Sequence, residues 1–211
     1  MFCYEHADLL LKLLVAVGAT VGFFVARRDY MRGQRWQKAQ ILLKLIDAFE
    51  RDERIAAACK MLDWDAREVK LSDGRSIEFR NDILLSALRV PAMDMTVKAS
   101  AEHPHGFTAE EEIIRDCLDA FFDFFHKLYA FWTTGLLNFE DYAYFQYWFG
   151  TLYYIGEYKG DEKIGRAIKQ YITSYKFVGI NELMKEYSKD PEPKMDLTQE
   201  ATLSLNKTDG R

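Results

Sequence analysis

The stretch from Ala109 to Thr134, AEEEIIRDCLDAFFDFFHKLYAFWTT, decides the fold. Apolar side chains recur in it every three or four residues, which is the period of an α-helix with one buried side. Thr108 before the stretch and Glu111 three residues later match a capping box, and Gly135 after it is a typical residue at a helix C-terminus. We therefore predict a helix over 109–134. The side chains expected on its buried side are Ile113, Ile114, Leu118, Phe121, Phe122, Phe125, Leu128 and Tyr129.

Further helices are predicted on both sides of this one. An apolar stripe of helical period begins at Trp36 and runs to Phe49, is interrupted by the charged residues 51–54, and resumes over 55–62. Downstream, Asn138 is expected to cap a helix that runs to about Tyr158, followed by a shorter helix over 162–176 and a last turn or helix over 180–188. The aromatic segment 142–156 within that region is short for a membrane crossing, so we interpret it as a core helix. An element that meets the membrane face is the alternative, since Tyr and Trp favour the interface.

A single β signal lies between these helices. Apolar and polar residues alternate in Val69-Lys70-Leu71 and again in Ile77-Glu78-Phe79, and the turn dipeptide Asp73-Gly74 separates the two segments. This pattern is typical of a β-hairpin. Asn81 or Asp82 is expected to cap a short helix through Leu88 that Pro91 ends, and residues 91–107 are expected to form a loop.

An apolar run near the N-terminus predicts the topology. Residues 9–26 read LLLKLLVAVGATVGFFVA, with Lys12 as the single charge. As a helix this run is roughly 27 Å long, close to the ~30 Å hydrocarbon core of a bilayer. A basic cluster follows it, against the single acid Asp29, and comprises Arg27, Arg28, Arg32, Arg35 and Lys38. We therefore predict a transmembrane helix over 9–26, a short extracytoplasmic N-terminus over 1–8, a cytoplasmic helical domain over 27–187 and a disordered tail over 188–211.

Two other interpretations of residues 9–26 stay open. A cleaved signal peptide has a basic start and a small-residue cleavage site, whereas Glu5 and Asp8 precede this run and Phe-Phe-Val-Ala-Arg-Arg ends it. A buried core helix is the second interpretation, which the arginines at the boundary make less favoured. Within the run, Gly18 and Gly22 lie four residues apart on one helix face, a spacing that favours close packing of two helices in lipid. We therefore expect a homo-oligomer that associates through Gly18 and Gly22.

Composition and motifs exclude several classes of protein. The chain has 211 residues, of which 49% are hydrophobic, so it is not a fully disordered chain. Lysine and arginine number 28 against 33 acidic residues, and this net charge of −5 supplies no basic field for nucleic acid. The sequence contains no glycine-rich phosphate loop and no nucleophile elbow, so we predict no catalytic residue and no cofactor. Cys3, Cys59 and Cys117 are widely spaced, which favours reduced thiols over a disulfide framework.

One polar constellation invites comparison with a metal centre. Asp116, Asp119, Asp123 and His126 recur at helical spacing on one face of the predicted helix 109–134. Bundle metalloproteins hold two irons with carboxylates and histidines that project from facing helices. Here the further ligands would have to come from a second helix, and the face lies opposite the Phe and Leu residues, where solvated charges belong. We therefore predict no metal site there, and we predict none at His103-Pro104-His105, where a loop supplies only two ligands.

Several of these segments together resemble an uncharacterised bacterial family of short membrane-anchored proteins. The resemblance extends from Trp36 to about Ile172 and rests on core and cap residues. They are the helix from Trp36 to Phe49, Met61-Leu62-Asp63-Trp64, Phe79-Arg80-Asn81-Asp82, the segment Ile114 to Phe122, and Gly135-Leu136-Leu137. The resemblance implies a single-pass protein of the bacterial inner membrane with a helical cytoplasmic domain. It implies no activity.

The sequence thus predicts a mainly α protein in which one transmembrane helix precedes a cytoplasmic helical bundle with one small β-hairpin. The favoured function is a non-enzymatic, membrane-tethered interaction or scaffold module, with the lipid bilayer, further copies of the chain and an unidentified protein as partners. The first alternative is a membrane effector of a bacterial antiviral or stress system that oligomerises and disrupts the bilayer. A metal-dependent enzyme that uses the face of Asp116 to His126 is the least favoured alternative.

Overall fold

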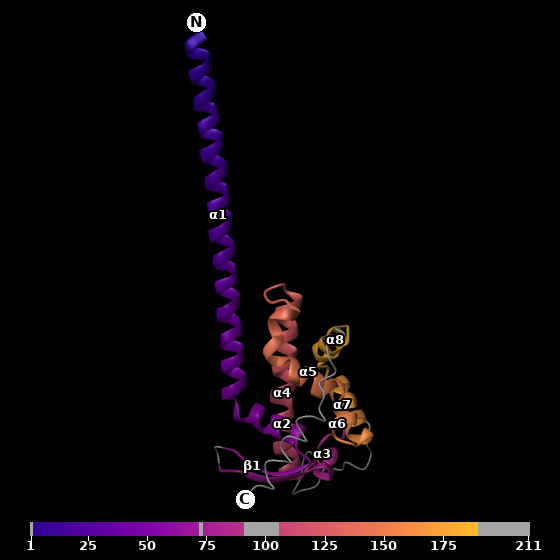
Figure 1. Cartoon of the computed structure of the whole chain (residues 1–211). Coiled ribbons are helices and arrows are strands. Elements are labelled where there is room, and N and C mark those ends of the chain that lie inside the picture. The colour runs from indigo at the N-terminus through magenta and orange to yellow at the C-terminus, as the bar shows by residue number, and fades with distance from the viewer. Residues whose placement is uncertain (1, 72–73, 91–105, 190–211) are drawn as a thin grey trace, which may run out of the picture. The chain divides into compact units, whose positions relative to one another are not determined.

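The computed structural model describes residues 2–71, 74–90 and 106–189, and for residues 2–13 and 158 it describes the backbone alone. The chain divides into two compact units, Met1–Ile46 and Asp47–Arg211, and each is described by itself. Both units are mainly helical, and one two-stranded antiparallel hairpin lies in the second (Figure 1). Residues 91–105 of the predicted loop 91–107 and residues 190–211 of the predicted tail 188–211 lie outside the described residues.

Helix α1 (Phe2–Arg51) forms the whole described part of the first unit and the first residues of the second. The two helical segments predicted at 9–26 and 36–49 are therefore one continuous helix. It ends where the sequence predicts an interruption, because the side chain of Asp52 accepts a hydrogen bond from the backbone N–H of Arg54 (2.9 Å) and starts helix α2 (Glu53–Asp63). Within the part of the chain that the structure describes, no helix combines the length and the apolar character that a membrane crossing requires. The first residues of the predicted span, 9–13, are outside the described side chains.

The predicted hairpin is confirmed, with longer strands than expected. Strands β1 (Ala66–Lys70) and β2 (Ser76–Arg80) pair in antiparallel register, with Val69 opposite Ile77. Gly74 has φ +87°, a left-handed backbone conformation that glycine adopts without a steric penalty. One face of the hairpin buries Val69, Ile77 and Phe79 against the helices, so the core stabilises a pair of strands that is marginal alone.

Helix α3 (Asn81–Ala87) begins directly after the second strand. The predicted side-chain cap at Asn81 or Asp82 is wrong, because Arg80 occupies the cap position in extended conformation and its side chain makes no capping hydrogen bond. The amide of Asn81 instead donates to Asp65 (3.2 Å), and Asp82 accepts from the guanidinium of Arg80 (3.2 Å). Tertiary contacts of these polar side chains thus replace the local cap.

Helix α4 (Ala109–Thr133) is the longest element of the second unit, and it begins as the sequence predicts. The hydroxyl of Thr108 accepts from the backbone N–H of Glu111 (3.2 Å), and the Glu111 carboxylate accepts from the N–H of Thr108 (2.8 Å). Gly135 follows the helix with φ +70°. The predicted buried side is confirmed at all positions except Tyr129, which is half-buried.

An aromatic cluster on α4 forms the centre of the core. Phe49, at the end of α1, lies within 5.0 Å of Phe124 and 5.4 Å of Phe145, measured between ring centroids. The rings of Phe121 and Phe125 are fully buried and 4.7 Å apart. Edge-to-face and tilted ring pairs of this kind add to the stabilisation from burial alone.

The single helix predicted from Asn138 to Tyr158 is wrong, because the structure breaks it twice. A 3-10 helix η1 (Phe139–Phe145), helix α5 (Gln146–Tyr153) and helix α6 (Ile155–Tyr158) occupy this region. The breaks lie at Phe145 (φ −98°, ψ 0°) and at Tyr154 (φ −99°, ψ 16°). Within η1, the fully buried Tyr142 also has a non-helical backbone (φ −88°, ψ 21°), and its hydroxyl donates to the carbonyl of Leu128 (2.7 Å). Tyr142, Phe145, Phe149, Leu152 and Ile155 are buried, which agrees with the favoured interpretation of a core segment, whereas Tyr144 and Tyr153 are exposed.

Two further helices complete the second unit. Helix α7 (Glu162–Ser174) approaches α6 so closely that a Cβ built on Gly165 would lie 2.7 Å from the Cα of Gly156. Helix α8 (Val178–Tyr187) packs on α4, where Gly179 leaves room for the ring of Tyr129. Both contacts depend on the missing side chain of glycine. The first joins consecutive helices, and the second joins segments that are distant in sequence.

Candidate functional site

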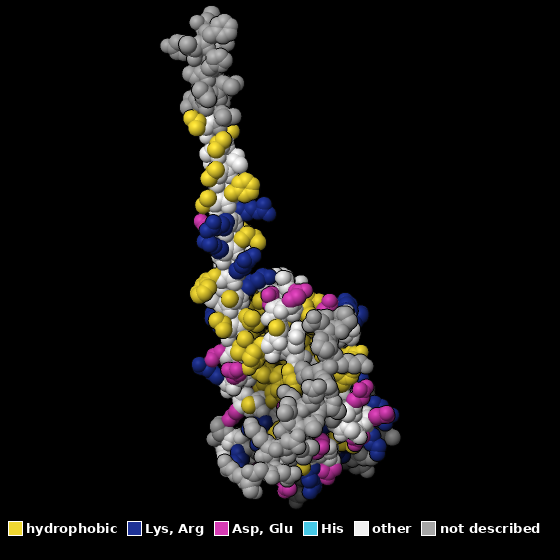
Figure 2. Space-filling model, viewed as in Figure 1, with side chains coloured by type: hydrophobic (Ala, Val, Ile, Leu, Met, Phe, Trp, Pro, Cys, Tyr) yellow, Lys and Arg dark blue, Asp and Glu magenta, His cyan; other side chains and the backbone are white. Residues whose placement is uncertain are grey.

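Among the residues that the structure describes, the most unusual surface is the apolar part of α1. Its large apolar side chains are strongly exposed on all sides of the helix, with 67% of Leu14, 57% of Val21 and 63% of Phe23 accessible. The other members of this group are Val15, Val17, Phe24 and Val25. Figure 2 shows them as yellow side chains along the helix, next to a group of dark blue basic residues. A helix that is apolar all round normally lies in a protein core or in a membrane.

The two glycines expected to mediate helix association lie on this helix. A Cβ built on Gly18 or on Gly22 would meet no atom within 4 Å, so this face of the helix is open. Between the glycines, the hydroxyl of Thr20 donates to the carbonyl of Ala16 (2.8 Å) and therefore leaves no unsatisfied donor at the surface. The local geometry thus meets the requirements for close helix packing, while the association itself stays a prediction.

The predicted basic cluster follows on the same helix. Arg27, Arg28, Arg32 and Arg35 are exposed, and Lys38 is half-buried. These five residues fall within 12 positions of one continuous helix, so about three helical turns carry them, and at 3.6 residues per turn they lie within an arc of about 140° on one side of the helix. Anionic lipid headgroups attract each such residue by about 1 kcal/mol near a membrane surface. We call this group the basic collar.

The acidic face of α4 is divided among separate partners. The carboxylate of Asp119 accepts from the hydroxyl of Tyr171 (2.7 Å), and Asp123 forms an ion pair with Lys127 (2.7 Å). Burial raises the pKa of Asp119, although the hydrogen bond from Tyr171 opposes this effect. Among the described residues, no three His, Cys, Asp or Glu side chains come together as metal ligands. His103 and His105 lie outside the described residues.

Sequence reasoning missed a polar cluster where α3 meets α4. The buried carboxylate of Glu111 accepts from Ser86, from Arg89 (3.1 Å) and from the N–H of Thr108 (2.8 Å). Burial alone would raise the pKa of Glu111, but the hydrogen bonds from Ser86 and Thr108 and the charge of Arg89 together lower it. The capping box at Thr108 was the only sequence signal for this cluster. The donors and acceptors of this cluster bond to one another, so we infer that the cluster holds α3 on α4.

Arg115 extends this cluster to helix α7. Its guanidinium donates to the carbonyl of Ala87 (2.6 Å), at the end of α3, and to the hydroxyl of Tyr175 (2.5 Å). The same group lies over the ring of Phe107, 4.2 Å from its centroid, and over the ring of Tyr171 at 5.0 Å. Arg115 therefore bonds to the C-terminus of α3 and stacks on the rings of Phe107 and Tyr171. The planar guanidinium group can do both at once.

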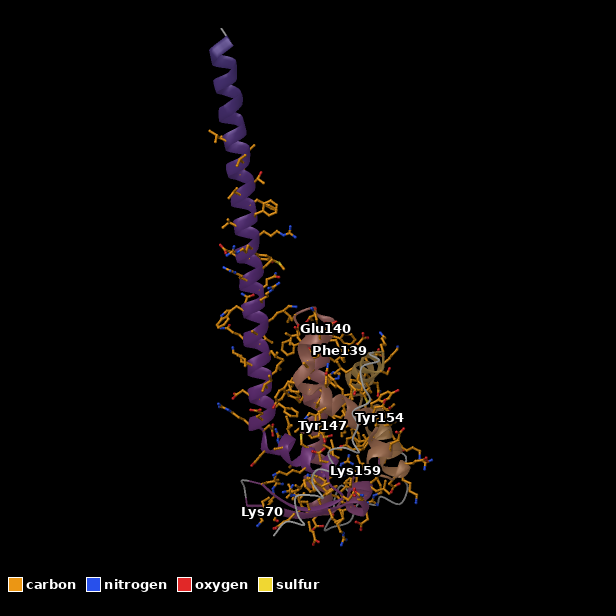
Figure 3. All side chains as sticks on the ribbon, viewed as in Figure 1. Lys70, Phe139, Glu140, Tyr147, Tyr154 and Lys159 are labelled. Carbon is orange, nitrogen blue, oxygen red and sulfur yellow. The ribbon has the colours of Figure 1, made fainter. Side chains whose placement is uncertain are left out.

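Lys159 is a second feature that the sequence does not indicate. Its ammonium, labelled in Figure 3, donates to the carbonyls of Met61 (2.9 Å) and Trp64 (2.6 Å) at the end of α2, and its side chain is 1% exposed. Burial lowers the pKa of Lys159 to about 8, and the charges of Asp65 and Asp63 oppose this effect. A cation at a helix C-terminus satisfies carbonyls that have no partner within the helix.

The thiols of the second unit have no features of reactive cysteines. Cys117 is fully buried and Cys59 is half-buried. Burial raises the pKa of the Cys117 thiol to about 12, and burial likewise raises the pKa of Cys59. A thiolate is the reactive form, so both side chains behave as small apolar groups at neutral pH.

Comparisons with known proteins add no assignment to this geometry. No family model, no curated protein and no solved structure matches the chain. We therefore infer the function from the chain's own residues.

Proposed function

We propose that the protein is a membrane-anchored interaction module, in which the apolar part of α1 crosses the bilayer and the second unit lies in the cytoplasm. The observation that carries this proposal is the exposure of seven large apolar side chains between Leu14 and Val25, directly before the basic collar. Transfer of these side chains from water into an apolar medium would be favourable by the order of 10 kcal/mol, at about 1.5–3 kcal/mol for each fully buried side chain.

The helix itself suits such a position. Its backbone donors and acceptors bond to one another, so no peptide group would be left unsatisfied in hydrocarbon. The collar follows the apolar segment directly, and a cluster of Lys and Arg on one side of a span favours the cytoplasmic side. The orientation with the second unit inside the cell follows from this asymmetry. A bacterial inner membrane is the location that the sequence resemblance implies.

The non-enzymatic part of the proposal is supported by the roles of the buried polar groups. Glu111 and Arg115 join α3 to α4 and α7, and Lys159 joins α6 to α2. These groups hold helices together in the described part of the second unit. We therefore propose that this unit presents a rigid helical surface to a protein partner, and that further copies associate through Gly18 and Gly22 of α1.

Membrane fractionation with a matched pair of arginine substitutions tests the anchor. Val21→Arg places a charge in the apolar segment, where it costs roughly 2.5–3.5 kcal/mol at the centre of a span. Leu43→Arg is the control, because Leu43 is equally exposed (65% against 57%) on the same helix but lies beyond the collar. We expect wild type and Leu43→Arg in the pellet that resists alkaline carbonate extraction, and a larger soluble fraction for Val21→Arg. Wild-type protein in the supernatant would refute the anchor.

Self-association through the glycine face is tested separately. Replacement of Gly18 and Gly22 with Ile should weaken association in a reporter assay for membrane helices, because the branched side chains keep the backbones apart. Ala19→Ile is the matched control, since it adds the same side chain beside this face. Equal association of all three proteins would remove the glycine face from the proposal while leaving the anchor in place.

A further inference from the structure

Helix α1 carries one row of exposed residues that recur at an interval of seven. Val15, Trp36 and Leu43 in this row are 65%, 67% and 65% exposed. Because α1 is one unbroken helix (Figure 1), the row continues from the apolar segment through the basic collar and beyond it. We call this row the α1 seam, and its members are Val15, Gly22, Asp29, Trp36 and Leu43.

A second set of residues completes a heptad pattern with the seam. Each of them lies three residues after a member of the seam, so the combined spacings alternate between three and four residues. They are Gly18, Val25, Arg32, Ala39 and Ile46. Apart from Asp29 and Arg32, all residues of the pattern are apolar or glycine. Positions spaced in this way stay on one side of a helix over many turns, and two helices that carry them pack as a left-handed coiled coil.

The charges within the pattern indicate what packs on the seam. Asp29 is the single acid between residues 9 and 46. Within the described part of the chain, its exposed side chain has no hydrogen bond and no ion pair. In a parallel coiled coil each seam residue packs among four residues of the other helix, and for Asp29 these include Arg28 and Arg32 of a second copy. Asp29 and Arg32 occupy successive layers, so each pair of like charges is flanked by a pair of opposite charge.

The other cations of the collar do not oppose one another in such a pair. In parallel helices, a residue that flanks the seam on one side meets the residue five positions later on the other helix. Arg28 then lies beside Gly33, and Arg35 lies beside Gln40, and neither neighbour is charged. The remaining two cations lie on the opposite side of the helix, and they are Arg27 and Lys38. The charges of the collar therefore complement a second parallel copy of α1.

We propose that a second copy of the chain packs along the α1 seam in parallel orientation, as a left-handed coiled coil that extends from the apolar segment to Leu43. The proposal rests on the proposed self-association at Gly18 and Gly22 and extends it past the collar. Trp36 and Leu43 lie about 14 and 24 Å beyond Arg27, at about 1.5 Å per residue. The proposed topology thus places both outside the hydrocarbon core, where their burial against another helix is favourable. An anionic headgroup is disfavoured as the occupant, because it would meet the carboxylate of Asp29.

Oxidative crosslinking of introduced cysteines tests the proposal on the full chain in membranes. Ala39→Cys places a thiol within the heptad pattern, where two parallel helices approach within the reach of a disulfide. Gln37→Cys is the matched control, because Gln37 is also exposed and lies two residues away, but about 160° around the helix from Ala39. Wild type provides the background, and its own thiols are Cys3, Cys59 and Cys117.

We expect at least fivefold more disulfide-linked dimer from Ala39→Cys than from Gln37→Cys. In the Ala39→Cys chain, Asp29→Arg should reduce the dimer at least threefold, because the arginines of the two copies then oppose one another. The exchange Asp29→Arg with Arg32→Asp should restore the dimer, since it returns opposite charges to successive layers and keeps the net charge of the wild-type chain.

Equal crosslinking of Ala39→Cys and Gln37→Cys, in a chain whose association still depends on Gly18 and Gly22, would overturn the coiled coil and leave the glycine face standing. A dimer that Asp29→Arg leaves unchanged would also overturn the proposal. So would a crosslink of Ala39→Cys to a different protein without a homodimer. If the glycine substitutions have no effect either, the proposed self-association itself fails.

Discussion

Replacement of Lys159 with Met should remove a pH dependence of stability that the wild-type chain shows in mildly alkaline solution. The ammonium is buried and donates to the carbonyls of Met61 and Trp64. Burial lowers the pKa of Lys159 from its usual 10.5 to about 8, against the smaller opposing effects of Asp65 and Asp63. The folded chain therefore releases this proton at a lower pH than the unfolded chain.

The sign and size of the effect follow from proton linkage. Between about pH 8 and pH 10.5 the unfolded chain binds more protons than the folded chain, so the free energy of unfolding rises with pH in this interval. Below pH 8 the cost of burying the charge is fully present. From pH 7 to pH 9.5 the contribution of Lys159 to the free energy of unfolding rises by about 2 kcal/mol, at about 1.36 kcal/mol for each pKa unit.

A measurement at a single pH would not isolate this effect. Lys159→Met removes the cost of the buried charge, but it also leaves the carbonyls of Met61 and Trp64 without their donor, which costs about 1–3 kcal/mol for a buried group. These two changes oppose each other at neutral pH. The difference between two pH values separates them, because only the first depends on protonation.

The assay is chemical unfolding of the full chain in a mild detergent at pH 7 and pH 9.5, followed by near-ultraviolet circular dichroism. We expect the free energy of unfolding of wild type to rise by about 2 kcal/mol more than that of Lys159→Met. Lys163→Met is the control, since Lys163 is exposed on α7 and its removal should leave the wild-type pH dependence intact. An identical pH dependence of wild type and Lys159→Met would refute the conclusion that the charged side chain of Lys159 is buried in the folded chain.

Three further substitutions test the packing of the second unit by the same unfolding assay. Gly165→Ala should lower the free energy of unfolding by about 1–3 kcal/mol, because its Cβ would lie 2.7 Å from the backbone of Gly156. Gly156→Ala should lower the free energy of unfolding by less than Gly165→Ala, or raise it. A Cβ at Gly156 would lie 3.6 Å from its nearest neighbour, and alanine has a higher helix propensity than glycine. Phe121→Ala should cost about 3–5 kcal/mol, because the ring is fully buried, and a cost under 1 kcal/mol would contradict the core described above. Asp119→Asn should change stability little or raise it at neutral pH, since burial raises the pKa of Asp119 and an amide oxygen still accepts from Tyr171; marked destabilisation would contradict this.

The elements that the sequence predicts well are those with a strong local signal. The capping box at Thr108, the apolar stripe of α4, the interruption near Asp52 and the hairpin turn at Gly74 all depend on residues close in the chain. The exposed apolar segment and the basic collar were also readable, because they depend on composition and order alone. Their roles as anchor and orientation signal stay predictions.

The elements that sequence reasoning missed depend on partners far away in the chain. Local patterning allowed one helix from Asn138 to Tyr158, but the chain breaks it at Phe145 and Tyr154, where the segment packs its large side chains into the core. Asn81 looked like a helix cap, but its amide donates to Asp65 instead. No prediction was made for Lys159, because nothing near it in sequence indicates that its ammonium reaches carbonyls more than 90 residues away.

The amino-acid sequence by itself therefore determined the helical class, the positions of the turns and the separation of an apolar, basic-flanked helix from an aromatic body. Periodicity, capping residues and charge order act over a few positions, so a single chain segment displays them. Only the tertiary structure decided where the helices break and which polar groups are buried. Burial and hydrogen-bond partners are properties of the folded chain, because they depend on which distant segments meet.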